Sequence, residues 1–269
     1  MQENTNDIFI TEKTGDIPFN SNEEYLAHLL CLEGSCLYRF NGKIYELKRA
    51  DLSIIRKREY IEYIQNSPDF RCKIIYARSS FIDLCAPQTN YGIRGSMALF
   101  LNPIMHLDEE QFERCQRDYE LLESRLADRK HLFWHETLAN AMQAAILDFF
   151  DFHASIYGNH DITTQQSLII SRFIEMLDRG TYRTHREVSY YADKLCVTPK
   201  YLSEVLKKVS GFGANYWINR YTALDISRLL RDKTLTFVQI SDIFNFSSPA
   251  YFSRYVQRTL GLNPTQYRD

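Results

Sequence analysis

Side chains that could bind a polyanion are concentrated in two matched stretches near the C-terminus. The stretches beginning at Thr198 and Ser248 lie fifty positions apart and share the order hydroxyl, proline, any residue, tyrosine, apolar residue, serine. Apolar residues recur at helical spacing on one face of each stretch. The opposite faces carry Lys200, Ser203, Glu204, Lys207 and Lys208 in the first, and Ala250, Ser253, Arg254, Gln257 and Arg258 in the second. Such groups on an exposed helix can bond phosphates and base edges.

The elements that position these faces follow from local sequence. Thr198 and Ser248 can cap a helix N-terminus, with a proline suited to the first helical position after each. The helices should end at Gly211 and Gly261, again fifty apart. A shorter helix is predicted before each, because Thr184–Glu187 and Thr236–Gln239 have the capping-box pattern. Helix, tight turn and second helix with a polar outer face describe a helix-turn-helix, present twice. The alternative is an ordinary helical bundle whose caps happen to agree.

The composition of the chain limits the classes of protein to which it can belong. The chain has 269 residues, 45% of them hydrophobic, which is enough for two packed cores. We expect domains at 1–157 and 158–269. The polar N-terminus and the short apolar runs predict neither a signal peptide nor a membrane span, and hence a cytoplasmic protein. From His160 onward 15 Lys and Arg stand against 10 Asp and Glu, whereas the remainder has 17 against 24, so the basic half fits a polyanion partner.

The sequence of the N-terminal part predicts an antiparallel β structure. After a loosely ordered lead-in over 1–24, short alternating segments predict strands at Tyr25–Leu32, Ser35–Phe40, Lys43–Leu47, Asp51–Ile55, Tyr60–Ile64 and Arg71–Ala77. Asn41-Gly42 favours a type I′ hairpin turn between the second and third of these strands. The spacing is typical of a small barrel or sandwich.

Helical periodicity follows the strands. Asp108 with Gln111 predicts a helix to about Leu126, and a second helix is predicted over His131–Ile156. These two helices could pack on the barrel or on another subunit. After a linker at Gly158–Asp161, a helix over Gln165–Asp178 precedes the first helix-turn-helix. A long helix over Asn215–Arg231 joins the two units, and Asn263-Pro264 begins a last turn. The fold class is therefore α+β, with an all-α C-terminal domain.

The C-terminal hundred residues resemble the AraC/XylS family of transcriptional regulators. The resemblance rests on the stretch Ile240–Arg254, ISDIFNFSSPAYFSR, and on the ending Gly261–Arg268, GLNPTQYR. More loosely, the N-terminal part resembles the cupin-like sensing barrel and dimerisation helices of such regulators. Four positions depart from the family pattern. Asn245 replaces the usual turn glycine but tolerates a left-handed conformation, Thr222 and Ile226 replace Arg and Ala in the connecting helix, and Gln257 replaces a frequent lysine.

The resemblance implies a regulator, more specifically an activator, that binds double-stranded promoter DNA through two recognition helices. It implies base contacts by Lys200, Ser203, Glu204, Ala250, Ser253 and Arg254. Phosphate contacts would come from Lys207, Lys208, Gln257, Arg258 and the helix N-termini at Thr198 and Ser248. RNA polymerase and a second copy of the chain are the further partners that the family suggests. A small effector would bind inside the barrel near Tyr38, Phe40, Tyr45 or Tyr63, which could equally be plain core.

Two alternatives stay open. A regulator without a ligand would respond to a protein partner or to its own abundance. A metal-dependent enzyme of the cupin type would need clustered His and carboxylate ligands on neighbouring strands. The strand region holds His28 alone, and His131 and His135 lie four apart on an expected helix without a further ligand. We therefore expect no enzyme, no metal and no cofactor. The six cysteines form no Cys-x-x-Cys pair and are expected to be buried or half-buried, although a redox role for Cys31 and Cys36 is conceivable.

Overall fold

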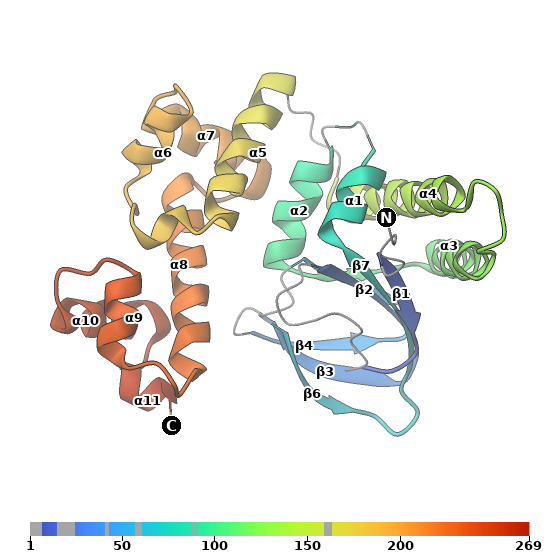
Figure 1. The fold of residues 1–269 in the computed structure, drawn as a ribbon, viewed down its shortest axis with the longest axis horizontal. Helices are drawn as coiled ribbons and strands as arrows, with labels where there is room; N and C mark the ends of the chain where they lie inside the picture. The colour runs from blue at the N-terminus through green and yellow to red at the C-terminus, as the bar shows by residue number, and fades with distance from the viewer. Residues whose placement is uncertain are drawn as a thin grey trace. The chain divides into compact units, whose positions relative to one another are not determined.

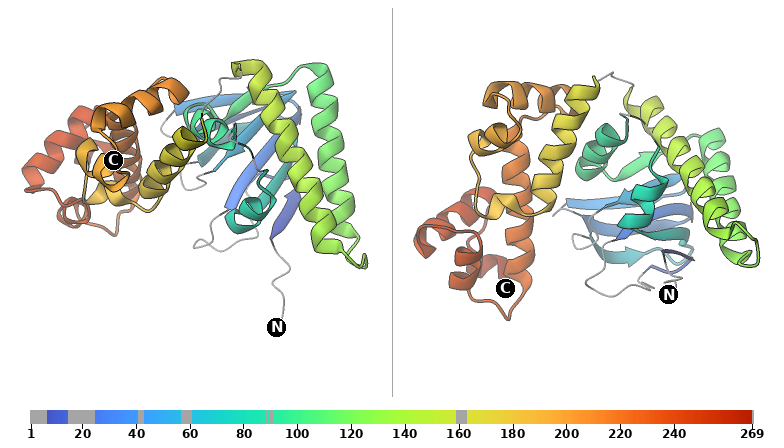
Figure 2. Two further views of the ribbon diagram at one scale, coloured as in Figure 1. Left: turned by 90° about the horizontal axis from the view of Figure 1, so that it is seen from above. Right: turned by 45° about the horizontal axis from the view of Figure 1, so that its top comes forward.

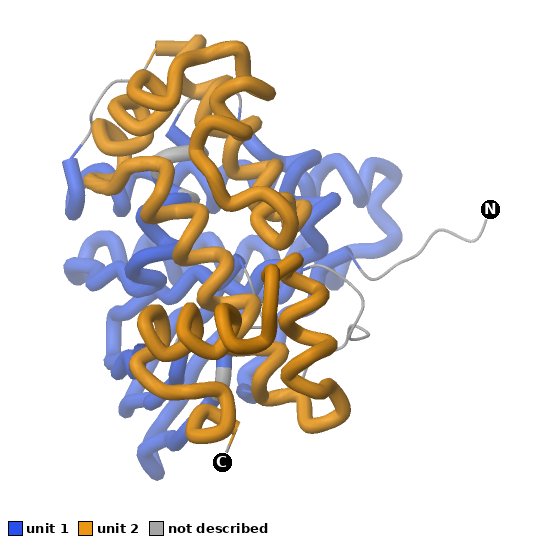
Figure 3. Tube along the Cα trace, turned by 90° about the vertical axis from the view of Figure 1, so that its left-hand side faces the viewer, with its two compact units in different colours: residues 1–160 blue, residues 161–269 orange. Residues whose placement is uncertain are grey.

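The computed structural model describes residues 7–14, 25–40, 43–56, 61–87, 89, 91–158 and 163–268. The chain divides into two compact units, Met1–His160 and Asp161–Asp269 (Figure 3). The predicted Asn41-Gly42 turn lies outside the described residues, as does the predicted linker beyond Gly158.

The N-terminal unit is built on two antiparallel sheets. The larger sheet has the order β1-β7-β2-β5-β8, and the smaller has the order β4-β3-β6 (Figure 1). The larger comprises β1 (Ile8–Thr11), β7 (Arg71–Arg78), β2 (Tyr25–Glu33), β5 (Asp51–Ile55) and β8 (Ile104–His106). The smaller comprises β4 (Lys43–Lys48), β3 (Ser35–Phe40) and β6 (Ile61–Asn66). The predicted antiparallel β domain is confirmed, as two sheets of an open barrel.

Alternation along the strands divides the side chains between two layers. On one face of the larger sheet, Leu30, Leu52 and Ile75 join a core cluster with residues of the following helices. The opposite face meets the smaller sheet, where the hydroxyl groups of Tyr38 and Ser53 lie 2.8 Å apart. The larger sheet is therefore buried on both sides, which explains the nearly unbroken burial of β2 and β5.

Two long helices cover the larger sheet. They are α3 (Glu109–Ala127) and α4 (Trp134–Tyr157), preceded by the shorter α1 (Ser79–Cys85) and α2 (Tyr91–Leu101). The predicted cap of α3 is confirmed, because Asp108 and Gln111 form a complete capping box. α4 begins three residues later than predicted, so His131 lies before the helix rather than on it. Figure 2 shows α3 and α4 running side by side.

The C-terminal unit is helical throughout and is organised around one long helix. The elements are α5 (Thr164–Asp178), the 3-10 turn η2 (Thr181–Arg183), α6 (Val188–Lys194), α7 (Pro199–Ser210), α8 (Ala214–Arg231), α9 (Phe237–Ile243), α10 (Pro249–Leu260) and α11 (Pro264–Arg268). α6 and α7 pack around one end of α8, and α9 to α11 around the other (Figure 1). In the part of the chain that the structure describes, no helix has the length and apolar character needed to cross a bilayer.

Candidate nucleic-acid interface

The first helix-turn-helix consists of α6 and α7. Thr198 caps α7 by accepting a hydrogen bond from the Tyr201 backbone amide at 3.2 Å, and Pro199 occupies the first turn. The preceding turn closes through Cys196, whose φ is 56°. Gly211 ends the helix in the left-handed region, at φ 80°. The caps and the glycine predicted from the sequence are confirmed here, and they fix where α7 begins and ends.

The second helix-turn-helix, α9 and α10, repeats the same local structure. Ser248 caps α10 with a 3.2 Å bond from the Tyr251 amide, and Gly261 ends it at φ 81°. Thr236 and Gln239 form the predicted capping box of α9. Asn245 takes the left-handed conformation expected of it, at φ 49°. The two helix-turn-helix units, called the two readers below, therefore match in the geometry of the turn, of the N-terminal cap and of the glycine that ends the second helix.

One predicted cap is wrong. Thr184 does not cap α6; its hydroxyl donates to the carbonyl of Thr181, and the helix begins after Glu187, which makes no side-chain cap. The reason lies in the fifty-residue register, which pairs the capping Thr236 with Arg186 rather than with Thr184. Thr184 instead closes the 3-10 turn η2. The start of α6 is consequently the least like its counterpart in the second unit.

The two recognition helices bury one face each and expose the other. Leu202, Val205 and Leu206 of α7 are buried, as are Phe252, Tyr255 and Val256 of α10. On the outer face of α7, the exposed side chains are Lys200, Glu204, Lys207 and Lys208, with Ser203 half-buried. On α10 they are Ala250, Arg254, Gln257 and Arg258, again with the serine, Ser253, half-buried. We call these two sets, with Thr198 and Ser248, the outer faces.

Charges on the outer faces make few competing contacts. Lys200 Nζ lies 3.9 Å from Glu204 Oε1, but the two side chains are 86% and 62% exposed. An exposed pair of this kind contributes little and can open for a ligand. Arg254 forms no ion pair with any described residue. The guanidinium of Arg258 lies 5.6 Å from the ring centroid of Tyr255 and stays exposed. These faces can therefore offer donors to an external anion.

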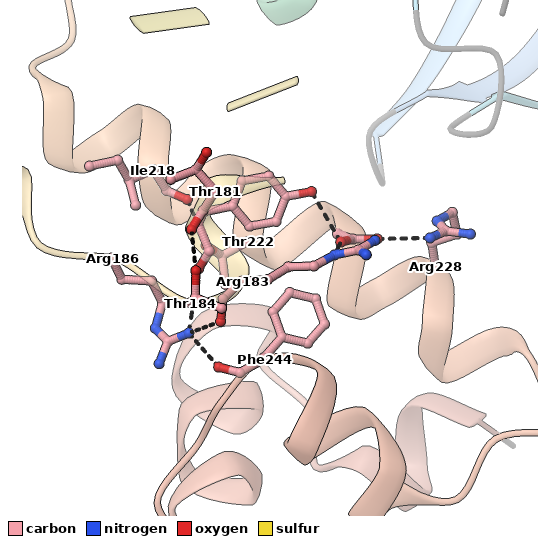
Figure 4. A network of polar contacts seen from close by, with 10 residues as sticks. Thr181, Arg183, Thr184, Arg186, Ile218, Thr222, Arg228 and Phe244 are labelled. Atoms are coloured by element: carbon pink, nitrogen blue, oxygen red, sulfur yellow. Dashed lines mark hydrogen bonds and ion pairs between the residues drawn. The ribbon is translucent and has the colours of Figure 1, made fainter. Parts of the chain in front are cut away.

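A polar network centred on the carboxylate of Asp225 joins α8 to the segment before α6, and Figure 4 shows its members Arg183 and Arg228. It accepts hydrogen bonds from Arg183 Nε at 2.7 Å, Arg228 Nη2 at 2.9 Å and the Tyr182 hydroxyl at 3.0 Å. Burial by itself would raise the pKa of Asp225. The two guanidinium groups outweigh burial and hold that pKa below its ordinary value. Asp225 is therefore ionised inside the unit, and it fixes the segment 181–183 against the connecting helix.

Sequence reasoning missed this network. A carboxylate on the apolar side of the expected helix over 215–231 was the available signal, since a buried charge needs a partner. No spacing rule links position 225 to positions 183 and 228 together. Thr222, which stands where the family usually has arginine, is accommodated within α8 itself. Its buried hydroxyl donates a hydrogen bond to the Ile218 carbonyl at 2.7 Å.

The four predicted effector residues lie together on the inner face of the smaller sheet. Tyr38 of β3 is paired in register with Tyr45 of β4 and Tyr63 of β6, and Phe40 lies two residues along β3. Tyr38 and Phe40 are each 1% exposed. The Tyr45 hydroxyl donates to the Leu101 carbonyl at 3.0 Å. The residues are brought together as one aromatic surface between the sheets, and the binding of an effector there stays a prediction.

The possible metal ligands and the thiols can be placed within the described part of the chain. No group of three or more His, Cys, Asp or Glu among them could hold a metal ion. Five of the six cysteines are buried as predicted, but the prediction is wrong for Cys196, which is exposed because it lies in the turn between α6 and α7. Burial raises the pKa of Cys31 to about 12 and that of Cys36 to about 11, which keeps both as unreactive thiols.

Comparison with known proteins points to the same part of the chain. Residues 191–269 match a family model described as a helix-turn-helix domain. The regulatory protein PocR of Salmonella typhimurium strain LT2 is 30% identical over 77 residues, which are 29% of this chain and 25% of PocR. The match thus spans about a quarter of the length of that curated relative.

Two solved structures resemble the chain over a longer stretch. ToxT of Vibrio cholerae strain SCE256, bound to an unsaturated fatty acid, is 15% identical with a TM-score of 0.45, covering 97% of this chain and 93% of that one. The AraC-like transcriptional activator CuxR is 12% identical with a TM-score of 0.38, covering 82% and 78%.

Proposed function

We propose that this chain, whose residues 191–269 form an AraC-type helix-turn-helix domain, is a sequence-specific DNA-binding regulator of transcription. The observation that carries the proposal is the repeated outer face. Two helices with the same cap, turn and glycine stop lie at the two ends of α8, and each exposes polar side chains along one side. A helix presented after a tight turn is the element that enters the major groove in proteins of this architecture.

The outer faces divide by chemistry into base contacts and phosphate contacts. Arg254 can bond the O6 and N7 atoms of guanine together, and Glu204 can accept from a cytosine amino group. Lys200, Ser203, Ala250 and Ser253 would complete the base-reading set. Lys207, Lys208, Gln257 and Arg258 lie further along the helices, and they would bind phosphates together with the amide groups near Thr198 and Ser248.

Selection from a randomised pool of double-stranded DNA tests the proposal directly. The full chain should enrich a defined sequence with two separated conserved blocks, and gel-shift titration should show tighter binding to it than to scrambled DNA by at least about a thousandfold. Recovery of unrelated sequences after repeated rounds, with equal affinity for scrambled DNA, would refute the proposal.

Arg254→Ala should weaken binding to the selected duplex by about 1–3 kcal/mol, which is roughly fivefold to 150-fold. The reason is the loss of a bidentate contact to one base, so preference at that base pair should also relax. Gel-shift titration against duplexes changed at each position measures both effects. The matched control is Arg172→Ala, which removes an exposed arginine from α5 and should leave affinity unchanged. If the Arg254 variant bound with full affinity, the guanidinium of Arg254 would not contact a base.

Lys207→Ala should change the salt dependence of binding rather than the sequence preference. The variant neutralises one phosphate fewer and releases one counterion fewer. The plot of log affinity against log salt concentration should therefore be less steep by about one ion. Titrations at several salt concentrations give the slope, and Lys130→Ala, at an exposed position of the N-terminal unit, serves as control. A slope equal to that of the unmodified chain would count against the phosphate contact.

Regulation would come from the N-terminal unit. We infer an activator that contacts RNA polymerase, forms a homodimer and responds to a small effector held by the aromatic surface between the two sheets. Thermal-shift screening of the full chain with small metabolites, fatty acids and sugars tests the effector, since a ligand that binds the folded state raises the melting temperature. A regulator controlled by a protein partner or by its abundance would show no such shift.

A further inference from the structure

The segment before the first helix-turn-helix touches the turn of the second one. Arg186 Nη1 donates to the Phe244 carbonyl at 2.6 Å, and also to the carbonyls of Arg183 at 3.0 Å and Tyr182 at 3.4 Å (Figure 4). Its guanidinium lies 4.5 Å from the ring centroid of Phe246. Phe244 and Phe246 flank Asn245, the left-handed residue of the turn between α9 and α10. One side chain thus joins the segment that leads into α6 to the turn of the second helix-turn-helix.

Aromatic contacts reinforce this junction. The ring of Tyr182 lies nearly parallel to that of Phe244, with centroids 6.4 Å apart, and the guanidinium of Arg183 lies 5.9 Å from the same ring. Phe244 is fully buried. The contact therefore joins the half-buried side chain of Arg186 to a residue of the packed interior.

The junction closes a triangle with the connecting helix. Asp225 of α8 holds Arg183, and Arg186, three residues further along, holds the second turn. Besides this junction, the main contacts that join the described helices of the two helix-turn-helix units run through α8. Small bends of α8 would therefore change the angle between α7 and α10 if the junction were lost. A direct contact between the first reader and the second opposes such bending. It fixes a third distance, in addition to the distances that hold each reader on α8.

On the basis of the proposed function, we propose that Arg186 is a positioning residue that sets the spacing of the DNA site. It touches no DNA; it fixes α7 relative to α10, and so fixes the separation of the two sequence blocks that they can contact together. One inserted base pair moves one block by about 3.4 Å and turns it by about 34° about the duplex axis. When Arg186 holds α7 and α10 in a fixed relative position, the two helices cannot both stay in contact with the displaced blocks. Without that contact, the angle between the helices can change and restore part of the binding.

Arginine suits this role better than lysine. Its planar guanidinium donates in fixed directions to several carbonyls while its face lies on the Phe246 ring. An ammonium group in the same place would keep the charge and some hydrogen bonds but lose the planar contact. Arg186→Lys should therefore show a weaker form of the effect of Arg186→Met, which keeps an unbranched apolar stem but is shorter and removes every polar contact.

The test uses full-length chains and duplexes derived from the selected DNA. The duplexes carry the original spacing, one base pair added or removed between the two blocks, or one block scrambled. We expect the unmodified chain to lose at least about tenfold in affinity when the spacing changes. Arg186→Met should bind the original spacing less tightly and lose at least about half of that spacing discrimination on a logarithmic scale. Its affinity for duplexes with one intact block should equal that of the unmodified chain.

The matched control is Arg228→Met. Arg228 also donates to Asp225, but from the same helix three residues away, so it links α8 to itself and not one reader to the other. It should lower stability and leave spacing discrimination unchanged. Thermal melts identify loss of folding, and Arg186→Lys supplies the measurement should Arg186→Met melt below the assay temperature.

Two outcomes overturn the inference. Unaltered spacing discrimination in both Arg186 variants would show that α8 alone sets the geometry, and an equal loss on all duplexes, single-block ones included, would assign Arg186 a merely structural role. Absence of specific binding by the unmodified chain would instead be the failure of the proposed function, and this inference would fall with it.

Discussion

Asp225→Ala is expected to lower the free energy of unfolding of the C-terminal unit by about 3 kcal/mol. Removing one partner of a buried ion pair leaves the remaining charges without compensation, which costs about 3–5 kcal/mol. Asp225 is 2% exposed in its side chain, whereas those of Arg183 and Arg228 are 39% and 40% exposed. Water can therefore rehydrate the two guanidinium groups in part, and the lower end of the range applies. The hydroxyl of Tyr182 loses its acceptor as well.

The two tryptophans allow this effect to be measured in the C-terminal unit alone. Trp134 lies in the N-terminal unit and Trp217, fully buried, lies in α8. In a Trp134→Phe background, urea unfolding followed by fluorescence reports on Trp217 only. Asp193→Ala, which removes an exposed carboxylate from α6, is the matched control and should stay within about 0.5 kcal/mol of the unmodified chain. A loss below about 1 kcal/mol for the Asp225 variant would mean that the network contributes little to stability.

His28→Leu is expected to alter how the stability of the N-terminal unit depends on pH. His28 is 3% exposed, packs against Phe149 of α4, and its Nδ1 has no hydrogen-bond partner among the described residues. Burial first, and the charge of Arg56 second, lower the pKa of His28 to about 3. The unfolded chain therefore takes up a proton near pH 6.5 that the folded unit refuses until about pH 3. Acid favours the unfolded state across this window, by about 2 kcal/mol between pH 7 and pH 5.

A second group, the half-buried Asp118, changes stability with pH in the opposite direction, so the two effects have to be separated by comparing variants. Burial, followed by the neighbouring charge of Asp148, raises the pKa of Asp118 to about 7. The folded unit then holds a proton that the unfolded chain releases above about pH 4, so stability rises as the pH falls from 7. The two contributions partly cancel in the unmodified chain. Without His28, the Asp118 contribution should be left, and the unit should become more stable toward pH 5.

Urea unfolding at pH 7, 6 and 5, followed by Trp134 fluorescence in a Trp217→Phe background, tests this expectation. His131→Gln, at an exposed position before α4, is the control and should reproduce the unmodified profile. Parallel profiles for His28→Leu and the unmodified chain would show that His28 stays accessible to protons in the folded unit.

Local signals predicted the helices of the C-terminal unit well, because their ends are set by residues adjacent in the sequence. Ser248, Thr236 and Gly261 act within one turn of their own position, and no distant contact has to be known. The outer faces followed from the same periodicity. The role of Arg186 could not be predicted, since it depends on Phe244, 58 residues away.

The N-terminal unit shows the opposite balance. Six strands were predicted from alternation, but β1 and β8 were missed, because each is a short edge strand paired with a distant neighbour. α2, Tyr91–Leu101, was missed as well; it has no acidic residue in its first turn and no basic residue in its last turn to mark its ends. The aromatic surface was identified by residue type only, and its assembly depends on the β4-β3-β6 register.

The length of α8 constrains how this chain can change in evolution. A helix of 18 residues extends for about 27 Å, and each residue added to it advances the following structure by about 1.5 Å and rotates it by about 100°. An insertion or deletion within α8 would therefore redirect everything downstream, whereas single substitutions on its solvent side would not. Related chains can be expected to vary in length at 232–236, between α8 and α9, and to keep the residue count of the helix itself.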